Sequence, residues 1–118
     1  MSSTDPVNIE KNTAKSTTED VEYTVRGNGR IKGELAVSFP PGPEGLIQVD
    51  LQIVEPGGKG SRPVITSPGN AYVSGDSIRK VWVVDVPVYA FEIIRARVTN
   101  ADATNAHDWG AEFSVVYP

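Results

Sequence analysis

The chain lacks cysteine and has a single histidine, and both shortages exclude kinds of chemistry. Without cysteine it can form no disulfide, thiolate metal site or cysteine nucleophile. One histidine, His107, cannot build a standard zinc shell. As a general base it has no nucleophile motif such as G-x-S-x-G to serve, and adjacent Asp108 points to the other side of an extended segment. We therefore expect no catalytic residue, no metal and no cofactor, and we predict that the protein is not an enzyme.

Positive charge is also scarce. Eleven Lys and Arg residues stand against fifteen Asp and Glu residues, which gives a net charge of −4. Nucleic-acid-binding proteins normally carry a basic face that releases counterions from phosphate. The charge balance therefore argues against a nucleic-acid partner.

Long apolar runs are missing as well. No stretch approaches the roughly 18 apolar residues that a membrane-spanning helix requires. The polar segment 1–20 lacks the apolar core of a signal peptide. We expect a soluble chain made in the cytoplasm, which can still be incorporated into a virion or another extracellular assembly.

Residues 1–18 are rich in Ser, Thr, Asn, Lys and Asp, and a segment of this composition buries little apolar surface. We expect a flexible polar N-terminal arm over 1–18 and a single folded domain over 19–118. The alternative is an arm that orders against a partner by adding a strand to a sheet edge, with Val7 and Ile9 as its anchors.

Short runs of alternating apolar and polar residues fill the rest of the chain, with Gly and Pro between them. This period-2 pattern predicts half-buried β-strands and leaves little room for helices. The predicted strands are Val21–Arg26, 31–39, 47–53, Val64–Thr66, Ala71–Val73, Ile78–Val88, Phe91–Thr99 and 109–117. We predict an all-β fold, a single antiparallel β-sandwich of six to eight strands in a jelly-roll or immunoglobulin-like arrangement, with a small barrel as the alternative.

Two segments carry more specific predictions. Gly27-Asn28-Gly29 separates two alternating runs and predicts a tight β-hairpin, because glycine readily adopts the positive φ angles of such turns. Ile78–Val88 is different, since its valines leave almost no polar alternation. Both of its faces should be covered, so we expect it to lie in the centre of the sandwich or at a subunit contact.

Exposed aromatic rings next to amides and carboxylates would suit carbohydrate binding, although aromatic residues more often fill small cores. The candidate stacking and hydroxyl-binding residues are Tyr72, Trp82, Trp109, Asn105 and Asp108.

The oxygen-bearing residues Asn100, Asp102, Asn105 and Asp108 lie close together in sequence, but their spacing fits no EF-hand. Asn and Asp also favour turns by bonding their own backbone, which is the better interpretation here.

Arg95 and Arg97 should share one face of a strand. We expect a solvated face on which they form a charged ladder with acids across the strands, Asp50 or Glu34. A subunit contact is the alternative for these arginines.

No motif in the sequence indicates a reaction, so we infer the function from the predicted fold and the polar N-terminal arm. A turn-rich β-domain with a polar arm suits a structural subunit that acts through protein–protein contacts, such as a virion decoration, capsid-associated or surface-appendage protein. Such a subunit should form a homo-oligomer, and a closed ring such as a trimer is the first choice. The alternative is a carbohydrate-binding module with a glycan as its ligand.

Overall fold

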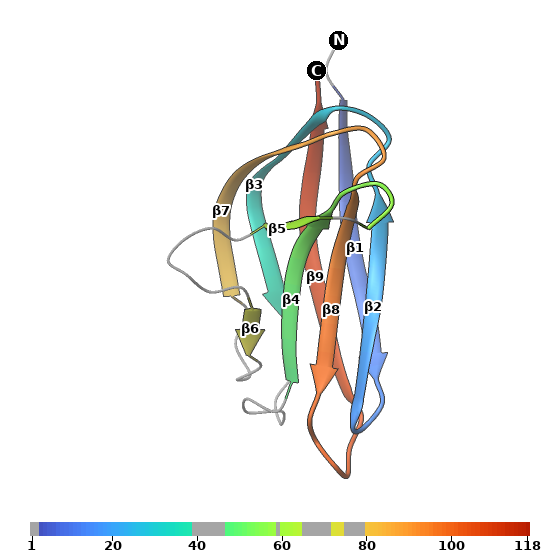
Figure 1. The fold of residues 1–118 in the computed structure, drawn as a ribbon. Helices are drawn as coiled ribbons and strands as arrows, with labels where there is room; N and C mark the ends of the chain where they lie inside the picture. Colours follow the sequence, from blue (N-terminus) through green and yellow to red (C-terminus); the bar gives the residue numbers. More distant parts are fainter. Residues whose placement is uncertain (1–2, 39–46, 59, 65–71, 75–79) are drawn as a thin grey trace.

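The computed structural model describes residues 3–38, 47–58, 60–64, 72–74 and 80–118. Within these ranges nine strands form two antiparallel sheets, and no residue is helical (Figure 1). The strands are β1 (Ser3–Thr13), β2 (Thr17–Thr24), β3 (Gly29–Ser38), β4 (Ile47–Val54), β5 (Ser61–Pro63), β6 (Tyr72–Ser74), β7 (Lys80–Val88), β8 (Ile93–Asn100) and β9 (His107–Tyr117). The structure thus confirms the predicted all-β sandwich.

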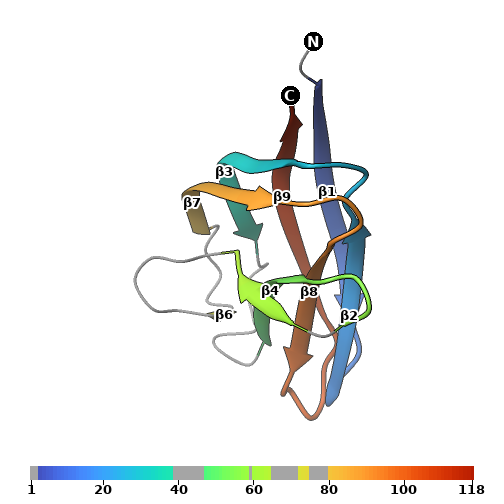
Figure 2. The same ribbon diagram turned by 45° about the horizontal axis from the view of Figure 1, so that its top comes forward.

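Successive strands mostly alternate between the two sheets. One sheet has the order β1-β9-β3-β7, and the other has the order β2-β8-β4-β5 with β6 also paired to β4. The connections β1–β2, β2–β3, β7–β8 and β8–β9 therefore cross from sheet to sheet at the ends of the sandwich. Figure 2 shows the β2–β3 and β7–β8 crossings running over the same end.

The core lies between the sheets and consists of the inward residues of each alternating run. In β4 these are Ile47, Val49, Leu51 and Ile53, all essentially inaccessible to solvent. Side chains at every second position of a strand point to one face, so a strand with this pattern needs a second sheet only on that side. The other large, fully buried side chains are Val25, Ile31, Leu35, Val37, Val64, Val88, Val98 and Val115.

The prediction of a flexible arm over residues 1–18 is wrong for residues 3–18, the part of the segment that the structure describes. Residues 3–13 form β1, which pairs with β9 without interruption from Ser3 opposite Tyr117 to Thr13 opposite His107. Val7 is buried and Ile9 packs against the core. Both residues therefore anchor β1 to the β9 edge of their own chain, whereas the alternative prediction placed them on the sheet edge of a partner. Backbone pairing and burial of alternate residues stabilise a segment whose composition is polar.

The predicted hairpin at Gly27-Asn28-Gly29 is also wrong. Strands β2 and β3 lie in different sheets, and none of these three residues has a positive φ. Gly29 is required for another reason: a Cβ there would overlap the carbonyl oxygen of Val116 on β9. The glycine permits a close approach between strands rather than a tight turn.

Strand β7 does not lie in the centre of the sandwich, as one prediction for Ile78–Val88 required. Among the described strands it pairs only with β3 and forms one edge of its sheet. Val84 and Val88 point into the core, whereas Val83 on the other face is 86% exposed. The second prediction for this segment, that it lies at a subunit contact, stays a prediction.

The docking of β1 can be tested with Val7→Ala. Removing two buried carbon atoms should lower the free energy of unfolding by about 2 kcal/mol, measured by urea denaturation. Asn8→Ala, on the exposed face of the same strand, should change it by less than about 0.5 kcal/mol. Equal, negligible effects of both variants would show that β1 is not docked in solution.

Candidate protein-docking site

Four large apolar side chains are substantially exposed in the described part of the chain, and all come from one short stretch. Val81 and Val83 lie on β7 with 44% and 86% of their surface exposed. Tyr89 and Phe91, in the turn that follows β7, are 54% and 67% exposed. An isolated exposed valine needs no explanation, but exposed apolar residues that gather in one stretch of the chain indicate a candidate interaction surface.

The β7–β8 turn holds Phe91 in an unusual conformation. The amide of Glu92 donates to the carbonyl of Tyr89 at 3.0 Å, which closes a four-residue turn. Phe91 occupies its third position with φ of 68°. This combination defines a type II turn, in which that position normally carries Gly or Asn. A bulky aromatic residue with positive φ is strained.

A buried carboxylate holds the turn together. Glu92 is 4% exposed, and its Oε1 accepts a hydrogen bond from the amide of Tyr89 at 2.7 Å. Arg62, the middle residue of the short strand β5, donates to both carboxylate oxygens at 2.7 and 2.8 Å. The same guanidinium donates to the carbonyl of Pro87 at 2.7 Å. Bidentate pairing of this kind fixes orientation as well as charge.

The β2–β3 crossing supports the turn from the other side. The amide of Phe91 donates to the carbonyl of Val25 at 2.9 Å, and the amide of Val25 donates to the carbonyl of Glu92 at 2.8 Å. The Oδ1 atom of Asn28 accepts a hydrogen bond from the amide of Ala90 at 2.9 Å. Residues 89–92 are therefore fixed to β5 and to the β2–β3 crossing, and the crossing runs beside the β7–β8 connection in Figure 2.

The two charged groups at this turn, the Arg62 guanidinium and the Glu92 carboxylate, form an ion pair. Hydrogen bonding to Arg62 lowers the pKa of Glu92 against the opposing effect of burial. The pKa of Arg62 is raised, chiefly by the hydrogen bond from its guanidinium to Glu92. The guanidinium also lies 5.7 Å from the ring centroid of Tyr89, within cation–π range. Both groups stay ionised, so the pair supports the turn at neutral pH.

A groove of about 390 Å³ lies at the same end of the molecule, between the start of β3 and the end of β9. Its surface is mainly apolar, and cationic side chains stand at one side. The residues that line it are Asn28, Gly29, Arg30, Lys32, Val116, Tyr117 and Pro118. Asn28 thus both lines the groove and holds the neighbouring turn.

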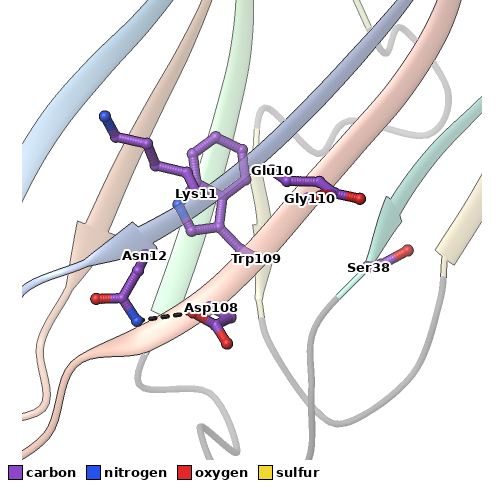
Figure 3. Close-up of a pocket in the computed structure, with 7 residues that line it drawn as sticks. All are labelled: Glu10, Lys11, Asn12, Ser38, Asp108, Trp109 and Gly110. Carbon is purple, nitrogen blue, oxygen red and sulfur yellow. Dashed lines mark hydrogen bonds between the residues drawn. The ribbon is translucent and has the colours of Figure 1, made fainter.

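The larger hollow, of about 580 Å³, lies beside the predicted sugar-binding residues Trp109 and Asp108 (Figure 3). Trp109 is 3% exposed, and its Nε1 donates to the buried Oγ1 of Thr13 at 2.9 Å. The prediction that Trp109 stacks on a ligand is therefore wrong, because no ring face is open. Asp108 is exposed and accepts a hydrogen bond from Asn12 at 2.7 Å.

The structure does not bring the remaining carbohydrate candidates together. Trp82 is partly buried and packs against the core from β7. Asn105 lies in the β8–β9 loop, and its side-chain amide donates to the hydroxyl of Thr104 at 3.1 Å. Tyr72 belongs to β6, but its side chain is outside the described residues.

The partner of His107 is Asp102, not the adjacent Asp108. The Nε2 atom of His107 lies 2.7 Å from Oδ2 of Asp102. The other carboxylate oxygen accepts hydrogen bonds from the amides of Thr104 and Asn105 and from the Thr104 hydroxyl. These bonds, the amide of Thr104 first, hold the pKa of Asp102 far below its usual range.

The proposed oxygen cluster thus acts on its own backbone. The side-chain Nδ2 of Asn100 donates to the backbone carbonyls of Thr13, Ala14 and Asn105. These bonds tie the β8–β9 loop to the β1–β2 turn. Asp102 caps the loop as described, in the manner of an Asx turn. Within the described residues no group of three His, Asp or Glu side chains could hold a metal ion.

The predicted charged ladder is present, with a different main partner strand. Arg97 donates to both oxygens of Asp20, and Arg95 donates to Glu22 at 2.8 Å, both acids lying on β2. Asp50 faces Arg97 from β4, as predicted, whereas the alternative partner Glu34 belongs to the other sheet. These pairs are largely solvated, and such pairs contribute little stability.

Sequence reasoning missed the β7–β8 turn entirely. The sequence pattern places Phe91 and Glu92 at the start of the predicted strand Phe91–Thr99 and assigns no role to Arg62. The signal in the sequence is the pair of aromatic residues Tyr89 and Phe91 shortly after Pro87. They stand in a turn whose third position would normally carry Gly or Asn.

The buried ion pair under the turn can be tested with Arg62→Ala. Leaving the Glu92 carboxylate unpaired should lower the free energy of unfolding by about 2 kcal/mol in urea denaturation at neutral pH. Arg97→Ala, which removes an exposed pair, should cost less than about 1 kcal/mol. Similar costs for the two variants would contradict a special role for the Arg62–Glu92 pair.

The same pair predicts a pH dependence. The pKa of Glu92 is lower in the folded than in the unfolded chain, so its contribution is complete at neutral pH and is lost as the pH falls through the acidic range. Glu92→Gln should therefore lose less stability between neutral and acidic pH than the wild type, measured by denaturation at each pH. An identical pH profile would refute this contribution.

No helix in the described ranges is long and apolar enough to cross a membrane. No protein-family model matches the sequence, and no curated protein matches it. Among solved structures, a chain in the structure of infectious bursal disease virus Gx strain is similar, with a TM-score of 0.41 and 15% sequence identity. The match covers 95% of this chain and 31% of that one, so this chain spans about a third of its length. A likeness of this degree indicates no function.

Proposed function

We propose that this β-sandwich is a non-enzymatic assembly subunit that acts through protein–protein contacts. A virion decoration, capsid-associated or surface-appendage protein is the type of subunit meant, with further copies of the same chain as its first partners. The supporting observation is the exposed apolar cluster of Val81, Val83, Tyr89 and Phe91, confined to β7 and its turn.

The position of the cluster supports contact rather than catalysis. The valines lie on the outer face of an edge strand, where they contribute nothing to the core of their own domain. Full burial of a Val or Phe side chain is worth roughly 1.5–3 kcal/mol. Association also costs several kcal/mol of translational and rotational freedom, about 4–15 kcal/mol in common estimates. One such cluster therefore gives firm binding only when symmetry repeats the contact.

Closed symmetry fits this requirement. Most homo-oligomers have closed point-group symmetry, which repeats each contact until no apolar surface is left exposed. A trimer remains the prediction for the number of subunits. The same surface also suits attachment to a larger assembly.

Sedimentation velocity over a concentration series tests the proposal. The wild type should form oligomers, and the double variant Val81→Thr with Val83→Thr should weaken their formation by at least about tenfold, because each hydroxyl replaces a buried methyl group. Thr keeps the β-branched shape and strand propensity of Val, so folding should be unaffected.

A matched control is Thr18→Val with Thr99→Val, which alters an exposed pair on the opposite sheet. This variant should sediment as the wild type does. A wild-type chain that stays monomeric at every concentration would overturn the homo-oligomer, and a tryptophan fluorescence response to sugars would favour the carbohydrate alternative.

A further inference from the structure

We propose that Phe91 is a docking residue for a second copy of this chain, seated in that copy's groove between β3 and β9. The inference rests on the proposed function, because it names one contact of the assembly. It concerns the end of the sandwich, whereas the valines of β7 lie on its side. The two contacts can therefore be tested separately.

The conformation of Phe91 is the first argument. A φ of 68° disfavours every residue with a bulky side chain, and Gly or Asn would relieve the strain. The phenyl ring is 67% exposed and does not belong to the core of its own domain. Folding thus gains little from this side chain and bears its strain. Strain of this kind is concentrated at functional positions.

The rigidity of the turn is the second argument. The ion pair of Arg62 with Glu92 and the bonds to Val25 and Asn28 fix the backbone on both sides of Phe91. A residue whose backbone is already fixed loses little backbone entropy on binding. Aromatic residues are also the most frequent anchors of protein interfaces.

The neighbouring groove is the third argument, and it identifies the occupant. It is mainly apolar, with Arg30 and Lys32 at its side, and aromatic rings pack favourably against both kinds of surface. Arg30 is paired with Asp85 on its outer side, and that pairing lowers the pKa of Asp85. The chain therefore carries both an exposed aromatic side chain and an apolar groove that could receive one.

The positions of these two features determine the symmetry of the contact. Asn28 lines the groove and also binds the turn, so projection and groove lie side by side at one end of the molecule. Two copies that meet end to end across a two-fold axis can each place Phe91 in the groove of the other. A self-complementary patch of this kind is typical of two-fold interfaces.

The contact should be weak on its own. Tyr89 and Phe91 are already partly buried, so the four side chains of two copies can bury roughly 500 Å². The groove surfaces that they cover bring the total for the contact to roughly 1,000 Å². That value is at the low end of specific interfaces, below the standard size of about 1,600 Å². We therefore expect a concentration-dependent pair, seen most clearly when the β7 contact is removed by the Val81→Thr, Val83→Thr double variant.

Substitutions at Phe91 separate docking from a structural role. In that double-variant background, Phe91→Gly and Phe91→Asn should each weaken end-to-end pairing at least about tenfold in sedimentation equilibrium. Both residues tolerate positive φ, so the melting temperature should stay the same or rise. A clear fall in melting temperature with unchanged pairing would overturn the proposal, because Phe91 would then serve only the fold.

The groove is tested by complementation. Val116→Arg should fill the groove and abolish pairing of that variant with itself. Mixed with Phe91→Gly, it should form heterodimers more readily than either variant pairs with itself, because one of the two contacts is kept: its intact Phe91 meets the intact groove of the other chain. Failure of the mixture to pair, while the unmodified background still does, would refute the knob-and-groove contact and leave the proposed function intact. Wild-type assembly that the Val81→Thr, Val83→Thr double variant does not weaken would do the reverse, because it would overturn the β7 contact and leave the end-to-end contact intact.

Discussion

Burial of alternate side chains between two sheets is the constraint on which the rest of this structure depends. Each strand supplies one apolar face, and the core of β4, β8, β3 and β9 residues forms only when the two sheets meet. Because consecutive strands mostly belong to different sheets, the chain must cross the ends of the sandwich repeatedly. The crossings bring polar backbone to those ends, where it has to be hydrogen-bonded.

The two ends satisfy this requirement differently. At one end, Asn100 and Asp102 bind backbone groups of the β8–β9 loop and the β1–β2 turn, and Trp109 adds a hydrogen bond to Thr13. At that end these polar side chains form hydrogen bonds within the chain itself. At the other end, the Arg62–Glu92 pair supports a turn that projects aromatic side chains outward. The difference makes the second end the better candidate for contact with another molecule.

Much of the fold could be predicted from local patterns, and the exceptions share a cause. The strand 47–53 was recognised from its alternation, and β8 and β9 likewise. The segment 1–18 was misassigned because its polar composition hides the alternation of Val7 and Ile9, and only pairing with β9 stabilises it. Gly27-Asn28-Gly29 was misassigned because a glycine needed for close approach to Val116 resembles a glycine needed for a turn.

The candidate site was less predictable than the fold. Trp109 was named for its chemistry, yet its exposure depends on Thr13, 96 positions away. Phe91 and Arg62 were missed because their roles arise from contacts between β5, the β2–β3 crossing and the β7–β8 turn. The sequence by itself determined which faces of the strands are apolar, because that alternation is a local property with a period of two. Only the tertiary structure decided which apolar faces stay uncovered, because exposure depends on the distant strands that pack on each face. Val81 and Val83 are the clearest case. The valine run of β7 indicates a strand covered on both faces, but these two side chains point to the outer face of their sheet, where they stay exposed.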